Sequence, residues 1–205
     1  MSNRLRFIAK DHELDRAEAV EYPVLVAGAI VPEKNSVAVF ESDKEFAAWA
    51  RETKYAAKVA ETSRLISEFP RVDVSDHQEA RRFQAMTHET TRNLERLADK
   101  IGVPTWSDEV FAKAIEEGIL RSSLIFRHIN LGGDFRPMVT GFPVPFFSWI
   151  GFNDTASSAL VSGALLLCAN SLFRGTRLWL FGAPALRWNL TDFGFNDRAS
   201  SGVAF

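Results

Sequence analysis

The chain has 205 residues, of which 46% are hydrophobic and 12% aromatic, so it can fold around a sizeable core and is not a disordered protein. Its formal net charge is −2, without the strong basic excess that is typical of nucleic-acid-binding proteins. A single cysteine, Cys168, excludes an intrachain disulfide, and its place in an apolar run predicts a small packed hydrophobe.

No apolar stretch of signal-peptide length follows the N-terminus. The longest apolar run, residues 164–168, is far too short to span a bilayer. We therefore expect a cytoplasmic protein with no membrane and no nucleic-acid partner, and keep secretion as the alternative.

Composition changes near residue 121. Every Lys and Glu lies before residue 122, whereas nine of the 12 glycines lie after it. Lys and Glu favour exposed helices, while Gly and aromatic residues favour turns and strands. We predict an α+β protein of two domains. Residues 1–121 form a mainly α-helical domain with a β-hairpin of two N-terminal strands and an unknown function, and residues 122–205 form an all-β domain.

Local patterns define the elements of the first part. Residues 22–31 and 36–40 are typical of strands, with a turn at 32–35. A helix is predicted to start at Ser42–Asp43 and to continue to about residue 69, before Pro70. A second helix runs from Ser75–Asp76 to Gly102, and a third begins at Ser107.

The second of these helices carries a stripe of apolar or small residues whose spacings alternate between four and three. Its members are Phe83, Thr87, Thr90, Leu94, Leu97 and Ile101. Bundle helices and dimerising coiled coils both show this pattern. We favour packing inside the same small domain, and a homodimer or a protein partner held by the helical part is the alternative.

The sequence contains no motif that predicts catalysis. His77 and His88 are eleven residues apart on one predicted helix, about 16 Å at 1.5 Å per residue, too far to share a metal. Arg92 stands where an HExxH motif beginning at His88 would need its second histidine. His12 and His128 have no partner nearby in the sequence, and GxSxG, P-loop and GxGxxG motifs with a supporting context are absent. We expect that the protein is not an enzyme.

The second part contains an internal repeat. Residues 151–158, GFNDTASS, recur at 194–201 as GFNDRASS, 43 residues later. A weaker copy precedes each: residues 126–133, FRHINLGG, align with residues 168–175, CANSLFRG, 42 residues later. The similar offsets predict two copies of one structural unit.

These motifs resemble the microbial βγ-crystallins, whose Greek key opens with an aromatic hairpin that ends in glycine and closes with a calcium clamp, N/D-N/D-x-x-S/T-S. Both clamps match in full, at 153–158 and 196–201, and the resemblance covers about residues 122–205. It implies a sandwich of two Greek-key motifs that binds two Ca²⁺ ions. Phe126, Cys168 and Leu131 depart from the aromatic positions of the family's hairpin, which affects its tyrosine corner and not the calcium ligands.

The resemblance also implies that the clamps exchange ligands across a pseudo-twofold axis. The implied protein ligands of one site are Asp154, the Arg198 carbonyl and the Ser200 hydroxyl. Those of the other are Asp197, the Thr155 carbonyl and the Ser157 hydroxyl. A hairpin carbonyl, at Arg127 or Ala169, completes each set.

The last serines of the clamps, Ser158 and Ser201, resemble the family's structural serine, which bonds back to the folded hairpin. Gly133 and Gly175 would supply the unusual backbone angles of that hairpin.

One carboxylate per site predicts modest calcium affinity. A bound ion still stabilises the fold, because the unfolded chain cannot assemble ligands from both clamps. We expect a structural or stress-related calcium-binding protein. Three alternatives remain: clamps that only build turns, an interaction module such as a protease inhibitor, and a helical half that carries the function with a calcium-responsive accessory domain. The single cysteine and the missing signal argue against the inhibitor.

Overall fold

The computed structural model describes residues 5–10, 12–33, 35–68, 75–104, 107–119 and 122–205. Within these ranges the chain forms five α-helices and nine strands. Hydrogen bonds connect all nine strands into one mixed sheet. The predicted combination of helices and strands is therefore confirmed at this coarse level.

The N-terminal strands form both antiparallel and parallel pairs. β1 (Arg6–Ala9) pairs antiparallel with β2 (His12–Leu14) and parallel with β4 (Ser36–Phe40). β3 (Val24–Gly28) pairs antiparallel with β4, which confirms the predicted hairpin, although β3 is shorter than the predicted residues 22–31. Residue 34 of the predicted turn lies outside the described residues.

A short helix, α1 (Arg16–Ala19), precedes β3 and was not predicted. Asp15 accepts a hydrogen bond from the Glu18 amide, and the Glu18 side chain accepts one from the Asp15 amide. This reciprocal capping box, D-x-x-E, is a signal that the sequence does contain.

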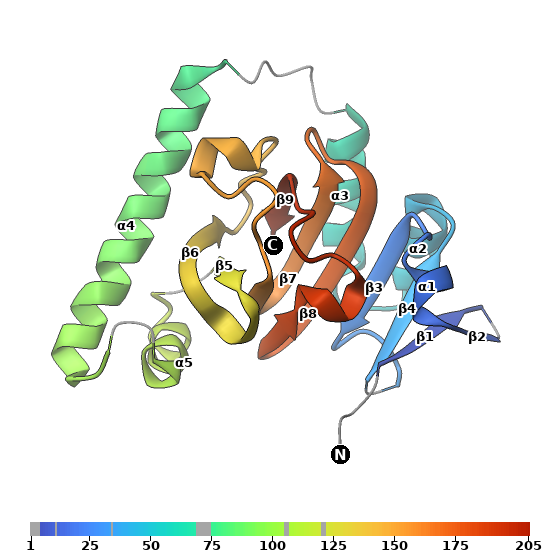
Figure 1. Ribbon diagram of the computed structural model, residues 1–205, viewed down its shortest axis with the longest axis horizontal. Coiled ribbons are helices and arrows are strands. Elements are labelled where there is room, and N and C mark those ends of the chain that lie inside the picture. Colours follow the sequence, from blue (N-terminus) through green and yellow to red (C-terminus); the bar gives the residue numbers. More distant parts are fainter. Residues whose placement is uncertain (1–4, 11, 34, 69–74, 105–106, 120–121) are drawn as a thin grey trace.

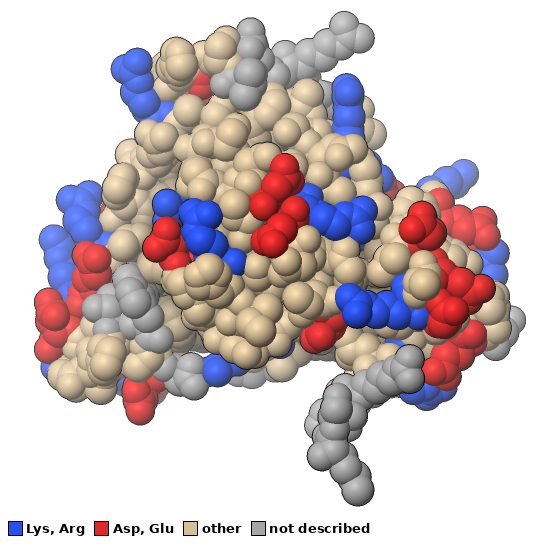
Figure 2. All heavy atoms as spheres, viewed as in Figure 1, with Lys and Arg blue, Asp and Glu red and all other residues tan. Residues whose placement is uncertain are grey.

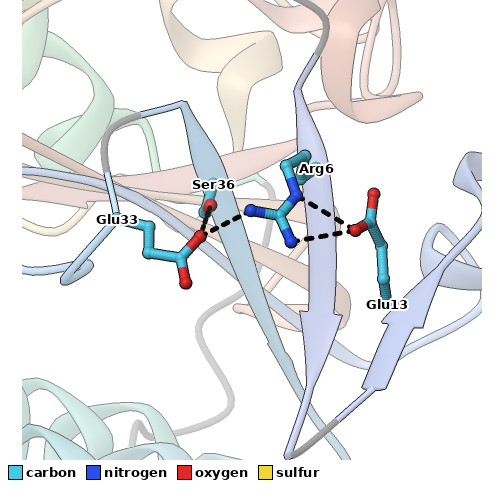
Figure 3. A network of polar contacts seen from close by, with 4 residues as sticks. All are labelled: Arg6, Glu13, Glu33 and Ser36. Carbon is cyan, nitrogen blue, oxygen red and sulfur yellow. Dashed lines mark hydrogen bonds and ion pairs between the residues drawn. The ribbon is translucent and has the colours of Figure 1, made fainter.

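An exposed cluster of charges ties β1 and β2 to the connection before β4 (Figure 3). The Arg6 guanidinium contacts Glu13 at 3.0 Å and Glu33 at 2.8 Å. These neighbours, Glu13 first, raise the pKa of Arg6. Because water surrounds all three side chains, the cluster contributes little to stability.

Two helices replace the single one predicted from Ser42 to about residue 69. α2 (Asp43–Ala50) is capped by Ser42 as predicted, and α3 (Ala56–Glu68) follows a break. The Thr53 hydroxyl donates to the Ala50 carbonyl and accepts from the Tyr55 amide, so it competes with the helical hydrogen bonds at this point. Residue 69 lies outside the described residues.

α4 (His77–Ile101) begins at the Asp76 cap and ends at Gly102, and α5 (Asp108–Glu116) begins at the Ser107 cap. Both helices follow the prediction. Leu94 and Leu97 of the stripe on α4 are buried against Phe111 of α5 and Phe126. The stripe therefore packs inside the chain, but against Phe126 and other residues of 122–205 as well as against α5, so it is not confined to the predicted helical domain.

The repeat-containing part alternates long strands with single turns of 3₁₀-helix. Its elements are β5 (Ser122–His128), η1 (Ile129–Leu131), β6 (Gly132–Val139), η2 (Phe147–Ile150), β7 (Ser158–Asn170), β8 (Arg174–Asn189), η3 (Leu190–Phe193) and β9 (Ser201–Ala204). In Figure 1 this part lies between α4 and α5 on one side and β1–β4 with α1–α3 on the other.

β7 and β8 are long strands, and the two halves of each pair with different neighbours. The first residues of β7 pair with β5 and with the end of β8, and its later residues pair with β9 and with the start of β8. The change coincides with a register shift between Val161 and Gly163, whose φ is +86°. A Cβ on Gly182, the residue opposite Gly163, would lie 2.0 Å from the Val161 carbonyl oxygen. Both strands thus need glycine where they bend.

The sheet continues across the composition change at residue 121. β3 pairs in parallel with β8, from Val24 opposite Arg177 to Gly28 opposite Phe181. Arg177 also forms a 2.7 Å ion pair with Asp43 at the start of α2. The division into residues 1–121 and 122–205 stays a prediction, and the two parts share hydrogen bonds and core.

Three hydrophobic clusters form the core. One includes Phe152 and Phe195 of the two repeated motifs. The second joins α2 and α3 to the sheet around Trp179, and the third joins α4 and α5 to β5. Figure 2 shows a group of acidic atoms near the centre of this face, with basic atoms on either side of it, and further charged residues at the flanks. Within the described residues no helix is both long enough and apolar enough to cross a membrane.

Candidate functional site

The two repeated octapeptides adopt the same conformation. Each follows a 3₁₀ turn, η2 or η3, that ends in a left-handed glycine: Gly151 has φ +66° and Gly194 has φ +64°. The acidic residues three positions later are also left-handed, with φ +49° at Asp154 and +52° at Asp197. Aspartate is one of the few residue types that tolerate this region. The sequence repeat is therefore a repeat of backbone geometry.

Backbone hydrogen bonds join the two clamps directly. The Asp154 amide donates to the Ala199 carbonyl, and the Asp197 amide donates to the Ala156 carbonyl, both at 3.0 Å. The two bonds are related by exchange of the repeats, because Ala156 and Ala199 hold the same position in each copy. The clamps thus lie side by side around an approximate twofold axis.

Side-chain hydrogen bonds also link each clamp to the other in a reciprocal way. The Ser200 hydroxyl donates to Oδ1 of Asp154 at 2.7 Å, and the Ser157 hydroxyl donates to Oδ1 of Asp197 at 3.2 Å. Both serines are 6% exposed, whereas both aspartates reach solvent. The structure therefore brings together the same aspartate–serine pairs that the resemblance assigned to each site.

The following serines connect the clamps to the hairpins. Ser158 donates to the His128 carbonyl and accepts from the Leu131 amide, and Ser201 donates to the Asn170 carbonyl and accepts from the Phe173 amide. The predicted bond from each serine back to its hairpin is confirmed.

The hairpins are folded as expected from the glycines. Gly133 has φ +72° and Gly175 has φ +75°, so the predicted unusual angles are present. A Cβ on either glycine would come within 2.9 Å of the side chain of His128 or Asn170. The residues of the two hairpin tips are left-handed as well: Asn130, Leu131, Leu172 and Phe173.

The backbone near the two candidate hairpin carbonyls is fixed by the clamps. The Ser157 amide donates to the carbonyl of Phe126, next to Arg127, and the Ser200 amide donates to the carbonyl of Cys168, next to Ala169. Each hairpin therefore lies beside the serine of one site, Arg127 with Ser157 and Ala169 with Ser200. Which hairpin carbonyl belongs to which site stays a prediction, and this pairing favours Arg127 with Ser157 and Ala169 with Ser200.

Two guanidinium groups flank the clamps. Arg198 donates to the Gly194 carbonyl and lies over the Phe195 ring, and Arg127 donates to the Gly151 carbonyl and lies over the Phe152 ring. Their side chains thus bind to the turns, and the carbonyls of the same residues are the candidate ligands.

Sequence reasoning missed a role for the first residue of each clamp. The side-chain amide of Asn153 donates to Oδ2 of Asp154, and the side-chain amide of Asn196 donates to Oδ2 of Asp197, both at 2.6 Å. Each carboxylate therefore has one oxygen held by its own clamp and the other held by the opposite clamp. The N/D-N/D element of the motif was the signal for this contact.

The environments of the two turns differ outside the clamps. A Cβ on Gly194 would lie 2.6 Å from Cγ1 of Val20, and the Arg16 guanidinium donates to the Thr191 carbonyl. Burial raises the pKa of Asp192, which Arg16 partly opposes. The corresponding Gly151 has only the Arg136 guanidinium nearby, 3.9 Å from its Cβ position.

The arrangement offers oxygen atoms only. Within the described residues no three His, Cys, Asp or Glu side chains gather as metal ligands, so a transition-metal centre has no donor set there. The four histidines are all exposed. Carboxylate, hydroxyl and carbonyl oxygens are the ligands that calcium prefers.

No protein-family model and no curated protein matches the chain. Several solved βγ-crystallin domains do. One from Ciona intestinalis is 25% identical, with 41% of this chain aligned to 99% of that one and a TM-score of 0.37. An archaeal one is 18% identical over 41% of this chain and 96% of that one, with a TM-score of 0.36. Spherulin 3a from Physarum polycephalum is 28% identical over 40% and 80%, with a TM-score of 0.33. The similarity to βγ-crystallins, microbial ones included, thus covers a domain-sized part of the chain.

Proposed function

We propose that the protein binds two calcium ions, one at each aspartate–serine pair between the clamps, and that the ions stabilise its fold. The observation that carries this proposal is the reciprocal contact of Ser200 with Asp154 and of Ser157 with Asp197. Two oxygens that already lie 2.7–3.2 Å apart can both contact one ion at the usual distance of about 2.3–2.6 Å.

The donor set suits a hard cation. At one proposed site the Asp154 carboxylate and the Ser200 hydroxyl would be joined by the carbonyls of Arg198 and Ala169. The serine hydroxyl donates its proton to the carboxylate. A cation between these two oxygens would take the place of that proton, which requires rotation of the hydroxyl.

The second proposed site has the same composition. It would combine Asp197 and the Ser157 hydroxyl with the carbonyls of Thr155 and Arg127. Exchange between the clamps makes each site depend on residues more than 40 positions apart in the sequence. Calcium would therefore bind the folded chain far better than the unfolded chain and raise its stability.

We expect modest affinity. Each site has one formal carboxylate, and low ligand charge weakens calcium binding. The Arg198 and Arg127 guanidinium groups bind to the carbonyls of the turns beside the clamps and add positive charge nearby.

The strand pairing supports the finer fold that we propose for residues 122–205, two Greek-key motifs that exchange strands. The end of β8 pairs with the start of β7, beside β5 and β6 of the first repeat, whereas Val144 of the first repeat bridges to Gly202 in β9 of the second. In this proposal the protein is a structural or stress-related calcium binder without catalytic activity.

Calorimetric titration of the full chain with calcium tests the proposal. We expect two ions per chain and a melting temperature that rises with calcium and falls with a chelator. Each occupied site should add about 2.7 kcal/mol of stability at a hundredfold excess of calcium over its Kd. Asp154→Ala should weaken one site strongly and the other less, while Asp99→Ala on the exposed face of α4 serves as the control. A melting temperature that ignores both calcium and chelator would contradict the proposal.

A further inference from the structure

A cleft of about 710 Å³ lies between the middle of α4 and the repeat-containing part. Its walls are Gln84, Thr87, His88 and Thr91 of α4, residues 133–136 of β6, and residues 148–151 of η2 and the following turn. Figure 1 shows α4 running past β6 and η2 along this side of the molecule. The volume lies within the range of small-molecule sites, about 300–1,000 Å³. None of the proposed calcium ligands lines it.

The sequence of α4 holds this cleft open. Near the start of the helix Phe83 packs edge-on against Phe142 at 4.8 Å, and towards its end Leu94 and Leu97 are buried in the core. Between these anchors the residues that face the repeat are polar. The side-chain amide of Gln84 donates to the Trp149 carbonyl at 3.0 Å. Both ends of the helix are therefore fixed by apolar contacts, while its middle turns present polar groups to the cleft.

The charges in the cleft are already engaged. Arg136 donates from Nε to the Ile150 carbonyl and from Nη1 to the Phe135 carbonyl, and its guanidinium lies 5.3 Å from the centre of the Phe152 ring. Asp134 lies 3.6 Å from the Arg127 guanidinium. These contacts use two of the five N–H donors of Arg136, and Arg136 and Asp134 give the cleft one basic and one acidic side chain, so no excess of positive charge favours phosphate or a nucleotide.

The remaining polar groups are amide, hydroxyl and imidazole groups next to Phe135 and Trp149, which are 7% and 8% exposed. The Gln84 carbonyl oxygen, the His88 imidazole and the Ser148 hydroxyl offer donors and acceptors, and Phe135 and Trp149 supply aromatic walls. The Thr87 and Thr91 hydroxyls donate to helix carbonyls and keep their lone pairs as acceptors.

We propose that this cleft binds a short, uncharged oligosaccharide. A sugar ring presents hydroxyl groups at its edge and C–H groups on its faces, which match a cleft that combines neutral polar side chains with aromatic walls.

An extended peptide fits the cleft less well. β6 pairs with β5 alone among the described strands, so its outer edge faces the cleft side of the molecule. Pro137 in the middle of β6 has no backbone N–H to donate, and proline on an edge strand discourages the addition of a further strand.

Calorimetry on the full chain tests the proposal with chitotriose, cellotriose and maltotriose, each up to about 10 mM, a range that detects millimolar Kd values. We expect at least one of them to bind with a stoichiometry of one. Gln84→Leu and His88→Ala should each weaken that binding by about tenfold, because each removes one protein side chain that would form a hydrogen bond with the ligand. Gln78→Leu is the matched control: it makes the same change on the same helix, outside the cleft.

The titrations are repeated in calcium and in chelator, since the cleft shares no ligand with the proposed calcium sites. Saccharide binding in both buffers supports the inference whatever the outcome of the calcium titration. Melting curves of the variants show whether they remain folded, and His88→Ala keeps the contact of Gln84 with Trp149 intact. The absence of heat with all three sugars, or wild-type binding by both folded cleft variants, would overturn it. Binding of inorganic phosphate that these two variants abolish would also overturn it.

Discussion

The hydroxyl of Ser200 donates a 2.7 Å hydrogen bond to Oδ1 of Asp154, a residue 46 positions earlier in the chain. The neighbouring Ser201 instead donates to the Asn170 carbonyl and accepts from the buried Phe173 amide. Two adjacent serines of one motif thus form different structural contacts. The first connects the two clamps, and the second holds a hairpin.

Replacing each serine by alanine should separate the effects of these contacts. Ser200→Ala should lower calcium affinity at one site and change the stability of the calcium-free protein by less than about 1 kcal/mol, because its partner Asp154 reaches solvent. Ser201→Ala leaves the buried Phe173 amide without an acceptor and should cost about 1–3 kcal/mol in chelator. Urea unfolding in chelator and calcium titration measure the two effects. Equal stability losses for both variants would contradict this division.

The two left-handed glycines offer a matched pair of substitutions. Alanine at Gly151 or Gly194 should cost about 1–2 kcal/mol from the positive φ alone. At Gly194 the added methyl group also meets Val20 at 2.6 Å, so a further cost of about 1–3 kcal/mol is expected. Urea unfolding of the two variants should show Gly194→Ala to be the less stable. In the double variant Val20→Ala/Gly194→Ala the difference should shrink, and its persistence would show that Val20 is not the cause.

Cys168 should report on unfolding. It is fully buried, and burial raises the pKa of its thiol to about 12. Because only the thiolate reacts with alkylating reagents, native protein should be labelled at the rate at which the chain opens. Calcium should slow the labelling, since the Cys168 carbonyl accepts the amide of Ser200 in a proposed site. Mass spectrometry measures the rate, and rapid labelling of the native protein would contradict the buried position.

The ion pair of Asp43 with Arg177 predicts an unusual pH dependence. Burial raises the pKa of Asp43 above its ordinary value of 3.8, and the effect of Arg177, which lowers it, is smaller. The folded state therefore holds this proton more tightly than the unfolded state does. The stabilising contribution is complete below about pH 3.8 and is lost as the pH rises through the raised pKa.

Asp43→Asn removes this titration. We expect the stability of the wild type relative to Asp43→Asn to fall as the pH rises above about 3.8. Urea unfolding at a series of pH values measures the difference, and Asp99→Asn, an exposed carboxyl on α4, provides the background. A difference that grows with pH would show that the attraction of Arg177 outweighs burial.

Sequence patterns predicted the elements whose signals are local. The Asp76 and Gly102 ends of α4 and the Ser107 start of α5 were found because capping depends on residues within one turn. The break between α2 and α3 was missed, because it depends on the Thr53 side chain competing for backbone hydrogen bonds rather than on Gly or Pro.

Contacts between distant segments were harder to predict. β1 and β2 are three or four residues long, too short for an alternating pattern, and the parallel pairing of β3 with β8 leaves no trace in either segment alone. The clamps were the exception, because the repeat itself showed that two distant segments were related. The cleft beside α4 was not predicted, because it depends on where the helix packs.

The position of β3 at the outer edge of β8 has a consequence for how the chain is made. During synthesis β3 and β4 leave the ribosome well before β8, because Arg177 of β8 lies 153 residues after its parallel partner Val24 of β3. Until then the β3 edge presents unpaired N–H and C=O groups to other chains. Nascent protein is therefore more exposed to aggregation until β8 has left the ribosome, and a truncation within β8 would leave that edge open permanently.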